Sequence, residues 1–185
     1  MRKFLILGVF VLLASVSASA DTVVTFDDLS GTGLVADGYG GINWHDNWTH
    51  YDFAQPPYTP ESSPSRVFDL PGGGDTFDFL TPQVFKGAFF SGNDFATVTF
   101  NLFNGATLVW TSATLAPNST PTFLSSGYSG LVTTVEVSSP RPDFFVMDDV
   151  TYGGESTTVP EPSSLLLLGT GLLSSLGFIR RKFGR

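Results

Sequence analysis

Two pairs of adjacent aspartates, Asp27-Asp28 and Asp148-Asp149, are the first groups in the chain that suggest a chemistry. If the strands that carry them lie side by side, four carboxylates come together and repel one another. Hard oxygen ligands of this kind suit calcium. The pattern predicts a structural calcium site at these four residues. The alternative is that strand alternation sends one aspartate of each pair to solvent while the other caps a turn.

A second group combines aromatic rings with short polar side chains between residues 44 and 58. Exposed flat rings stack on sugar faces, and polar side chains fix the hydroxyls. A carbohydrate site is therefore predicted at Trp44, Trp48, Tyr51 and Tyr58. In the alternative interpretation, Trp44 and a neighbouring Phe53 fill the core and the other rings pack the loop.

Patterns typical of catalysis are weak. Residues 31–36 fit a dinucleotide-binding fingerprint superficially, but a glycine-rich stretch follows where a helix should run. There is no Gly-x-Ser-x-Gly motif, and the two histidines, His45 and His50, lie in one predicted loop. Asp27 or Asp148 as the acid of a glycoside hydrolase is the enzymatic alternative. We predict that the protein is not an enzyme and has no catalytic residues.

The charge distribution limits the partners. All 17 acidic residues lie between Asp21 and Glu161, where only Arg66, Lys86 and Arg141 oppose them, which leaves a net charge of −14 on that part. Such a surface repels nucleic acid and attracts divalent cations. The chain has no cysteine, so disulfides, thiol catalysis and cysteine-ligated metal sites are excluded.

The elements that must position these groups are short strands. Apolar or alternating runs are separated by Gly, Pro, Asn and Ser clusters, without helical periodicity. An Asn104-Gly105 pair between two such runs predicts a hairpin with a type I′ turn. A long aromatic-rich loop is expected at 45–65. The fold class is all-β, a β-sandwich, with strands at 22–27, 41–44, 66–70, 75–80, 84–90, 95–103, 106–112, 131–138 and 144–152.

The N-terminus has the pattern of a secretory signal peptide. Arg2 and Lys3 precede an apolar run at 4–14, and Ala18-Ser19-Ala20 supplies the small residues of a cleavage site. Residues 1–20 are therefore assigned to the signal peptide. The body at 21–158 fits one domain with a real core.

The C-terminus has three parts: Val159-Pro160-Glu161-Pro162, an uncharged run at 163–179, and a basic cluster that starts with Arg180-Arg181-Lys182. As a helix the run spans roughly 25 Å, slightly less than the roughly 30 Å hydrocarbon core. The basic cluster should stay cytoplasmic. Residues 159–185 are predicted to form a hydrophobic sorting helix that crosses the membrane transiently; an ordinary C-terminal anchor is the alternative.

This three-part tail resembles the PEP-CTERM sorting signal. The resemblance covers residues 159–185 and implies processing by a membrane-embedded exosortase. It also implies export through the inner membrane to the cell surface or extracellular matrix, in association with exopolysaccharide and biofilm.

Four segments of the body resemble galactose-binding-like jelly rolls: residues 26–29, 38–44, 101–105 and 144–150. The resemblance implies a jelly-roll-like sandwich with a carbohydrate-binding or structural role, and a structural calcium near the termini. The sequence thus predicts an exported structural protein of the surface or matrix. A carbohydrate-binding module is the alternative, and a secreted hydrolase is a distant one.

Overall fold

The computed structural model describes residues 20–62, 64–69 and 76–153, all within one compact unit, Ser19–Ser156. The predicted sorting helix and nearly all of the predicted signal peptide fall outside these residues. Among the residues described, no helix is long and apolar enough to cross a membrane.

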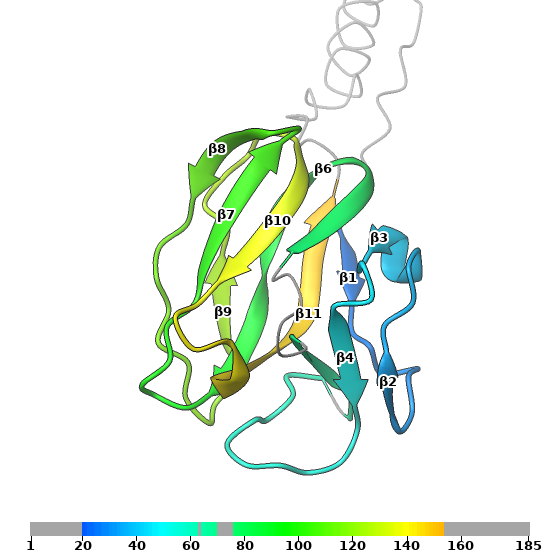
Figure 1. The fold of residues 1–185 in the computed structure, drawn as a ribbon, viewed down its shortest axis with the longest axis vertical. Helices are drawn as coiled ribbons and strands as arrows, with labels where there is room; N and C mark the ends of the chain where they lie inside the picture. Colours follow the sequence, from blue (N-terminus) through cyan, green and yellow to red (C-terminus); the bar gives the residue numbers. More distant parts are fainter. Residues whose placement is uncertain (1–19, 63, 70–75, 154–185) are drawn as a thin grey trace, which may run out of the picture. The chain divides into compact units, whose positions relative to one another are not determined.

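The predicted all-β class is confirmed, and one long strand organises the fold. β6, Thr76–Gly92, has its first half in one layer and its second half in the other (Figure 1). Every strand pair is antiparallel. Because β6 belongs to both layers, the two layers form one continuous hydrogen-bonded sheet.

The first half of β6 pairs with two strands, and the layer continues outward through two more. Their order is β3–β6–β10–β7–β8. Their bounds are β3 Ile42–Asn43, β10 Val132–Ser138, β7 Thr99–Asn104 and β8 Thr107–Thr111.

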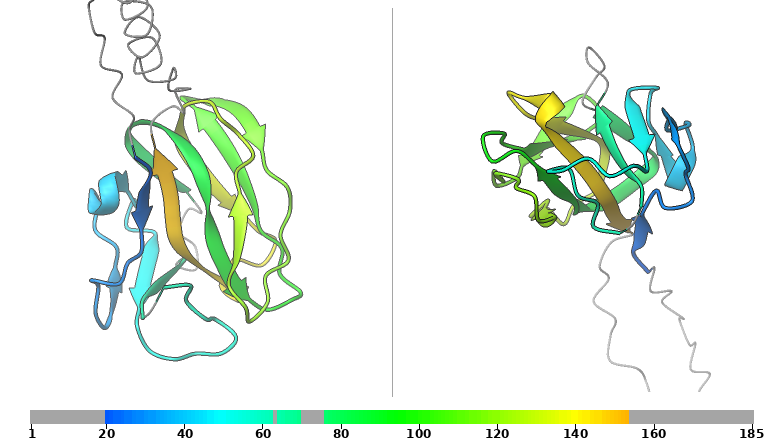
Figure 2. Two further views of the ribbon diagram at one scale, coloured as in Figure 1. Left: turned by 180° about the vertical axis from the view of Figure 1, so that it is seen from behind. Right: turned by 90° about the horizontal axis from the view of Figure 1, so that it is seen from below.

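The second half of β6 pairs with β9 on one side and β11 on the other, and the layer continues through β5, β4 and β2 (Figure 2). β1 pairs with the end of β11, with Thr22 opposite Tyr152. The expectation that the first and last strands lie side by side is therefore confirmed. The bounds are β1 Thr22–Val24, β2 Thr32–Leu34, β4 Trp48–Tyr51, β5 Arg66–Asp69, β9 Thr122–Ser125 and β11 Phe145–Gly153.

The sequence prediction divided β6 into two strands, at 75–80 and 84–90, because Pro82 interrupts the run. The structure keeps one strand through Pro82, as the chain there passes between the layers. β2, β4 and β9 were not predicted. β4 lies in the expected loop, and its polar Thr49 and His50 are buried, so its pattern does not alternate.

The predicted hairpin is present as β7 and β8, but its turn differs. Asn104 pairs with Thr107, so the loop is Gly105-Ala106 rather than Asn104-Gly105. Only Gly105 has a positive φ, of 58°, whereas a type I′ turn needs positive φ at both central residues. The glycine therefore occupies the first central position of the turn.

Aromatic rings fill the space between the layers. Trp44, Trp48, Phe77 and Phe85 are all fully buried, and Phe77 contacts each of the other three. Such edge and tilted contacts add to the free energy gained by burying the rings. This cluster fixes the position of β4, and therefore of the loop that follows it. Two short 3₁₀ helices, η1 Tyr39–Gly41 and η2 Pro142–Phe144, complete the fold.

Candidate functional site

The segment at 52–65 joins β4 to β5, and side chains outside it donate hydrogen bonds to its backbone carbonyls. Arg66, at the start of β5, donates from Nη2 to the Phe53 carbonyl at 2.7 Å and from Nη1 to the Pro64 carbonyl at 3.2 Å. The Ser91 hydroxyl donates to the Thr59 carbonyl at 2.5 Å. We call residues 52–65 the covering loop, because two pockets lie against it.

A buried carboxyl group holds the middle of the covering loop. Oδ2 of Asp148, on β11, accepts from the backbone N–H groups of Glu61 at 2.8 Å and Ser62 at 3.1 Å. Asp149 accepts from the Ser62 hydroxyl at 2.7 Å. Burial, with the Asp149 charge beside it, raises the pKa of Asp148 to about 8. The Asp148 side chain therefore remains largely protonated at neutral pH.

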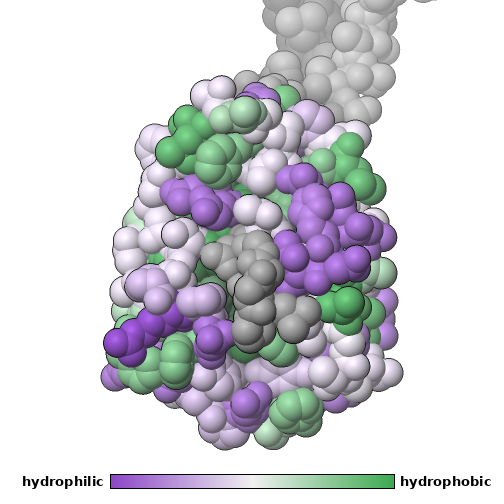
Figure 3. Space-filling model, in the orientation of Figure 1, coloured by the Kyte–Doolittle hydropathy of each residue, from purple (hydrophilic) through white to green (hydrophobic). Residues whose placement is uncertain are grey.

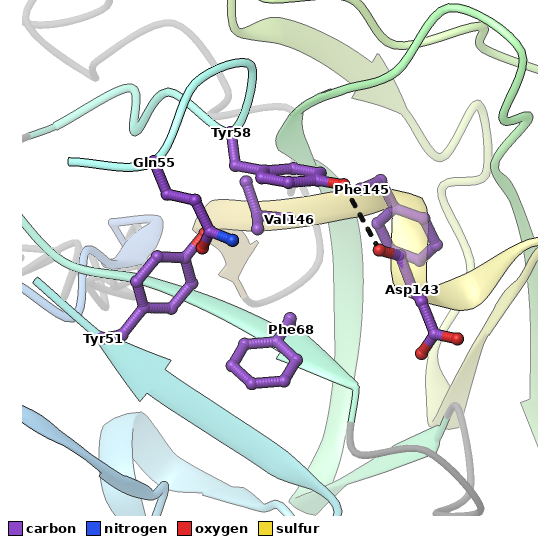
Figure 4. Close-up of a pocket in the computed structure, with 7 residues that line it drawn as sticks. All are labelled: Tyr51, Gln55, Tyr58, Phe68, Asp143, Phe145 and Val146. Atoms are coloured by element: carbon purple, nitrogen blue, oxygen red, sulfur yellow. Dashed lines mark hydrogen bonds between the residues drawn. The ribbon is translucent and has the colours of Figure 1, made fainter. Parts of the chain in front are cut away.

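The first pocket, of about 300 Å³, opens between the covering loop, β4, β5 and β11 (Figure 4). The Tyr58 hydroxyl donates to the Asp143 carbonyl at 3.4 Å and accepts from the Asn93 amide at 2.9 Å. Rings on several sides, with an amide and a carboxylate, form a lining suited to a ligand with both apolar and hydroxyl-bearing surfaces. The lining residues are Tyr51, Gln55, Tyr58, Phe68, Asp143, Phe145 and Val146.

A second pocket, of about 340 Å³, shares Gln55 and Tyr58 with the first. It is lined by Asp52, Ala54, Pro56, Thr59, Pro60, Pro64 and Arg66 as well. The covering loop thus contributes to both pockets.

The structure corrects half of the predicted carbohydrate site. Trp44 and Trp48 are 0% exposed, and their indole N–H groups donate to the carbonyls of Tyr39 and Thr76. Because both rings belong to the core, neither can stack on a sugar. Tyr51 and Tyr58, in contrast, both line the first pocket. Phe53, assigned to the core in the alternative interpretation, is 53% exposed.

Three of the four aspartates take part in two separate hydrogen-bond networks. Asp28 accepts from the Tyr39 hydroxyl, and burial together with this bond raises the pKa of Tyr39. Asp148 and Asp149 hold the covering loop instead. Oδ1 of Asp27 is buried without a hydrogen-bond partner. Within the described ranges, no group of three or more His, Cys, Asp or Glu side chains could hold a metal ion. The calcium site at these four residues stays a prediction.

The two histidines have separate partners. Nε2 of His45 lies 3.0 Å from Oδ2 of Asp78, while His50 is buried in β4 and covers Gly33 of β2. Hydrophilic residues gather around the position of β3 on the face seen in Figure 3.

Sequence reasoning did not identify Gln55, Phe68, Asp143, Phe145 and Arg66 as site residues. They come from the covering loop, β5, η2 and the start of β11, and only the strand pairing brings them together. The sequence did contain one indication of a special role for Arg66, because it is one of only three basic residues between Asp21 and Glu161.

The comparisons with known proteins concern the tail. Residues 158–182 match the family model described as the PEP-CTERM protein-sorting motif. This sorting motif implies that the protein is exported, held transiently at the membrane by its C-terminal segment, and processed by an exosortase on its way to the cell surface. No curated protein and no solved structure matches the chain. The resemblance of the body to galactose-binding-like jelly rolls is thus left without a matching relative.

Proposed function

We propose that the protein is a non-catalytic structural component of the cell surface or extracellular matrix, associated with exopolysaccharide or biofilm and delivered by the exosortase route. The match of residues 158–182 to the sorting motif is the observation that supports the route. The charge of −14 between Asp21 and Glu161 supports the destination, because such a domain stays hydrated and binds cations of the medium. The absence of cysteine makes its stability independent of the redox state outside the cell.

Replacement of Pro160, Glu161 and Pro162 together by Ala tests the route. The N-terminal signal should still drive secretion, but C-terminal processing should stop, so the intact mass should include the tail. Ser156→Ala with Thr157→Ala, just before the matched residues, is the control and should be processed normally. Identical C-termini in the triple variant and the unchanged protein would contradict the proposal.

A second candidate function is saccharide binding in the first pocket. It is supported by the rings of Tyr51, Tyr58, Phe68 and Phe145 around a cavity that also contains the Gln55 amide. Ring faces pack against the apolar faces of sugars, and an amide can both donate to and accept from hydroxyls. The Asp143 carboxylate, drawn at the side of the pocket in Figure 4, offers further acceptor atoms.

A glycan panel presented to the exported protein tests this candidate. Binding of at least one neutral glycan is expected, and Tyr58→Ala should weaken it about tenfold, as expected for the loss of a stacking ring. Phe123→Ala is the control, because Phe123 is 39% exposed on β9 and lines neither pocket. Equal losses in both variants would argue against this pocket.

Structural calcium is a separate proposal. It is supported by Oδ1 of Asp27, a buried carboxylate oxygen without a hydrogen-bond partner. Asp28 adjoins it, and β1 pairs with β11 close to Asp148 and Asp149. A bound cation would satisfy this oxygen and offset the adjoining charges of Asp27 and Asp28.

A further inference from the structure

Arg66 is a buried cation without a carboxylate partner. It is 1% exposed, and among the residues described, the one ion pair joins His45 to Asp78. A buried charge is costly unless another charge or hydrogen bonds compensate it. In a domain with so many carboxylates, a buried arginine that makes no ion pair with any of the described ones needs an explanation.

The hydrogen bonds of the Arg66 guanidinium are incomplete. The group has five N–H donors. One bond each reaches the carbonyls of Phe53 and Pro64, and Nε has no partner. The Tyr51 ring lies 4.0 Å from the guanidinium carbon and stabilises the charge through its π face. At least the Nε donor is therefore left for another acceptor.

Arg66 lines the second pocket, so that acceptor can come from a ligand. The planar fork of a guanidinium matches the two oxygens of a carboxylate. Asp52 lines the same pocket and accepts from the Gly31 N–H at 2.7 Å. Its negative charge disfavours a dianion such as phosphate, whereas its oxygens can accept from hydroxyl groups. A singly charged ligand that also carries hydroxyls suits both residues.

The remaining lining residues have the polarity that a sugar ring requires. Tyr58 offers an aromatic surface, and Gln55 and Thr59 can donate and accept hydrogen bonds. Apolar walls come from Ala54, Pro56, Pro60 and Pro64. This combination provides apolar contact for one face of the ring and polar partners for its edge.

We propose that the second pocket binds a sugar acid, with its carboxylate paired to Arg66 and its hydroxyls directed to Asp52 and Gln55. The sugar part of this inference extends the proposed saccharide role, whereas the anion site at Arg66 does not depend on it. The carboxylate of the ligand supplies the negative charge that compensates the buried Arg66 guanidinium.

Calorimetric titration of the exported protein at pH 7 tests the proposal with four probes: D-glucuronate, D-glucose, acetate and inorganic phosphate. Glucuronate should bind at least about tenfold more tightly than each of the others, because only it uses both the cation and the hydroxyl partners. Equal affinity for glucuronate and glucose, or tighter binding of phosphate, would overturn the assignment. Acetate binding as tightly as glucuronate would overturn its sugar part.

Arg66→Lys keeps the charge but removes the fork, and should weaken glucuronate binding at least about tenfold. Arg141→Lys is the matched control, because Arg141 lies over the Phe95 ring and lines neither pocket.

If Arg66→Lys fails to fold, the amide chemical shifts of the unchanged protein show where glucuronate binds. Glucuronate should shift Thr59, Ser65 and Arg66, and shifts confined to Lys86 and Arg141 would refute the site. Neutral glycans that bind while glucuronate does not would refute this inference alone and leave the proposed function standing.

Discussion

Oδ2 of Asp148 lies 2.8 Å from the backbone nitrogen of Glu61, although 87 positions separate the two residues. This bond ties the covering loop to β11, the strand beside β6. Both pockets depend on the position of that loop. The state of one buried carboxyl group is thereby linked to the shape of the candidate site.

The first prediction concerns pH. The pKa of Asp148 rises from 3.8 to about 8 on folding, so the folded state keeps a proton that the unfolded state loses. The free energy of unfolding should therefore fall as the pH rises from about 4 to about 8, by up to about 1.4 kcal/mol per pH unit. Urea denaturation of Asp148→Asn across this range should give a flatter profile. The exposed Asp94→Asn should keep the slope of the unchanged protein.

A second prediction concerns the aromatic core. Phe77 contacts Trp44, Trp48 and Phe85, and its side chain is fully buried. Phe77→Ala should lower the free energy of unfolding by about 3–5 kcal/mol, because it removes the ring and leaves a cavity. Leu80→Ala, at a 64% exposed position on the same strand, should cost far less. Chemical denaturation curves measure both, and similar losses would contradict the described packing.

Gly87 gives a third prediction. Its φ is +143°, and a Cβ there would collide with the backbone oxygen of Leu124 on β9. Gly87→Ala should therefore separate β9 from β6 and lower the melting temperature by roughly 10 °C, which corresponds to about 2–3 kcal/mol. Gly105→Ala is a control with open space around the added carbon, although its φ of +58° carries a smaller strain. Amide exchange should increase in β9 only for the Gly87 variant.

Calcium provides a fourth prediction. At about 100 times its dissociation constant, calcium should add about 2.7 kcal/mol to the stability of the folded state. Thermal scans in calcium and in chelator measure this difference, and magnesium should substitute poorly because it demands a tighter octahedral shell. Asp27→Asn should abolish the effect. Identical melting temperatures in calcium and chelator would show that the aspartates bind no metal.

The sequence was sufficient to predict the strand class because Gly, Pro and Asn clusters separate most strands and Val and Phe alternate within them. It was insufficient for β4, where the adjacent residues Trp48 and Thr49 are both buried and no alternation marks the strand. It also placed Trp44 and Trp48 in a ligand site, since ring content alone does not distinguish a stacking surface from a core. Burial depends on partners such as Phe77, and strand pairing sets these.

Arg66 shows what single-sequence reasoning lacks. Its type and position were known, but its contact with the Tyr51 ring follows from the pairing of Tyr51 with Arg66 across β4 and β5. Asp148 likewise depends on the fold: the sequence shows only one member of an acidic pair, whereas in the fold its carboxyl group is buried and its pKa is raised.

The pairing of β11 has a mechanical consequence. β11 has β1 and β5 on one side and β6 on the other, and it leads directly into the C-terminal part of the chain. A pull on that end acts along a strand held from both sides, so the backbone bonds resist in shear, all loaded together, rather than being peeled apart one at a time. A force applied at that end would thus act on a strand that is bonded to neighbours along both of its edges.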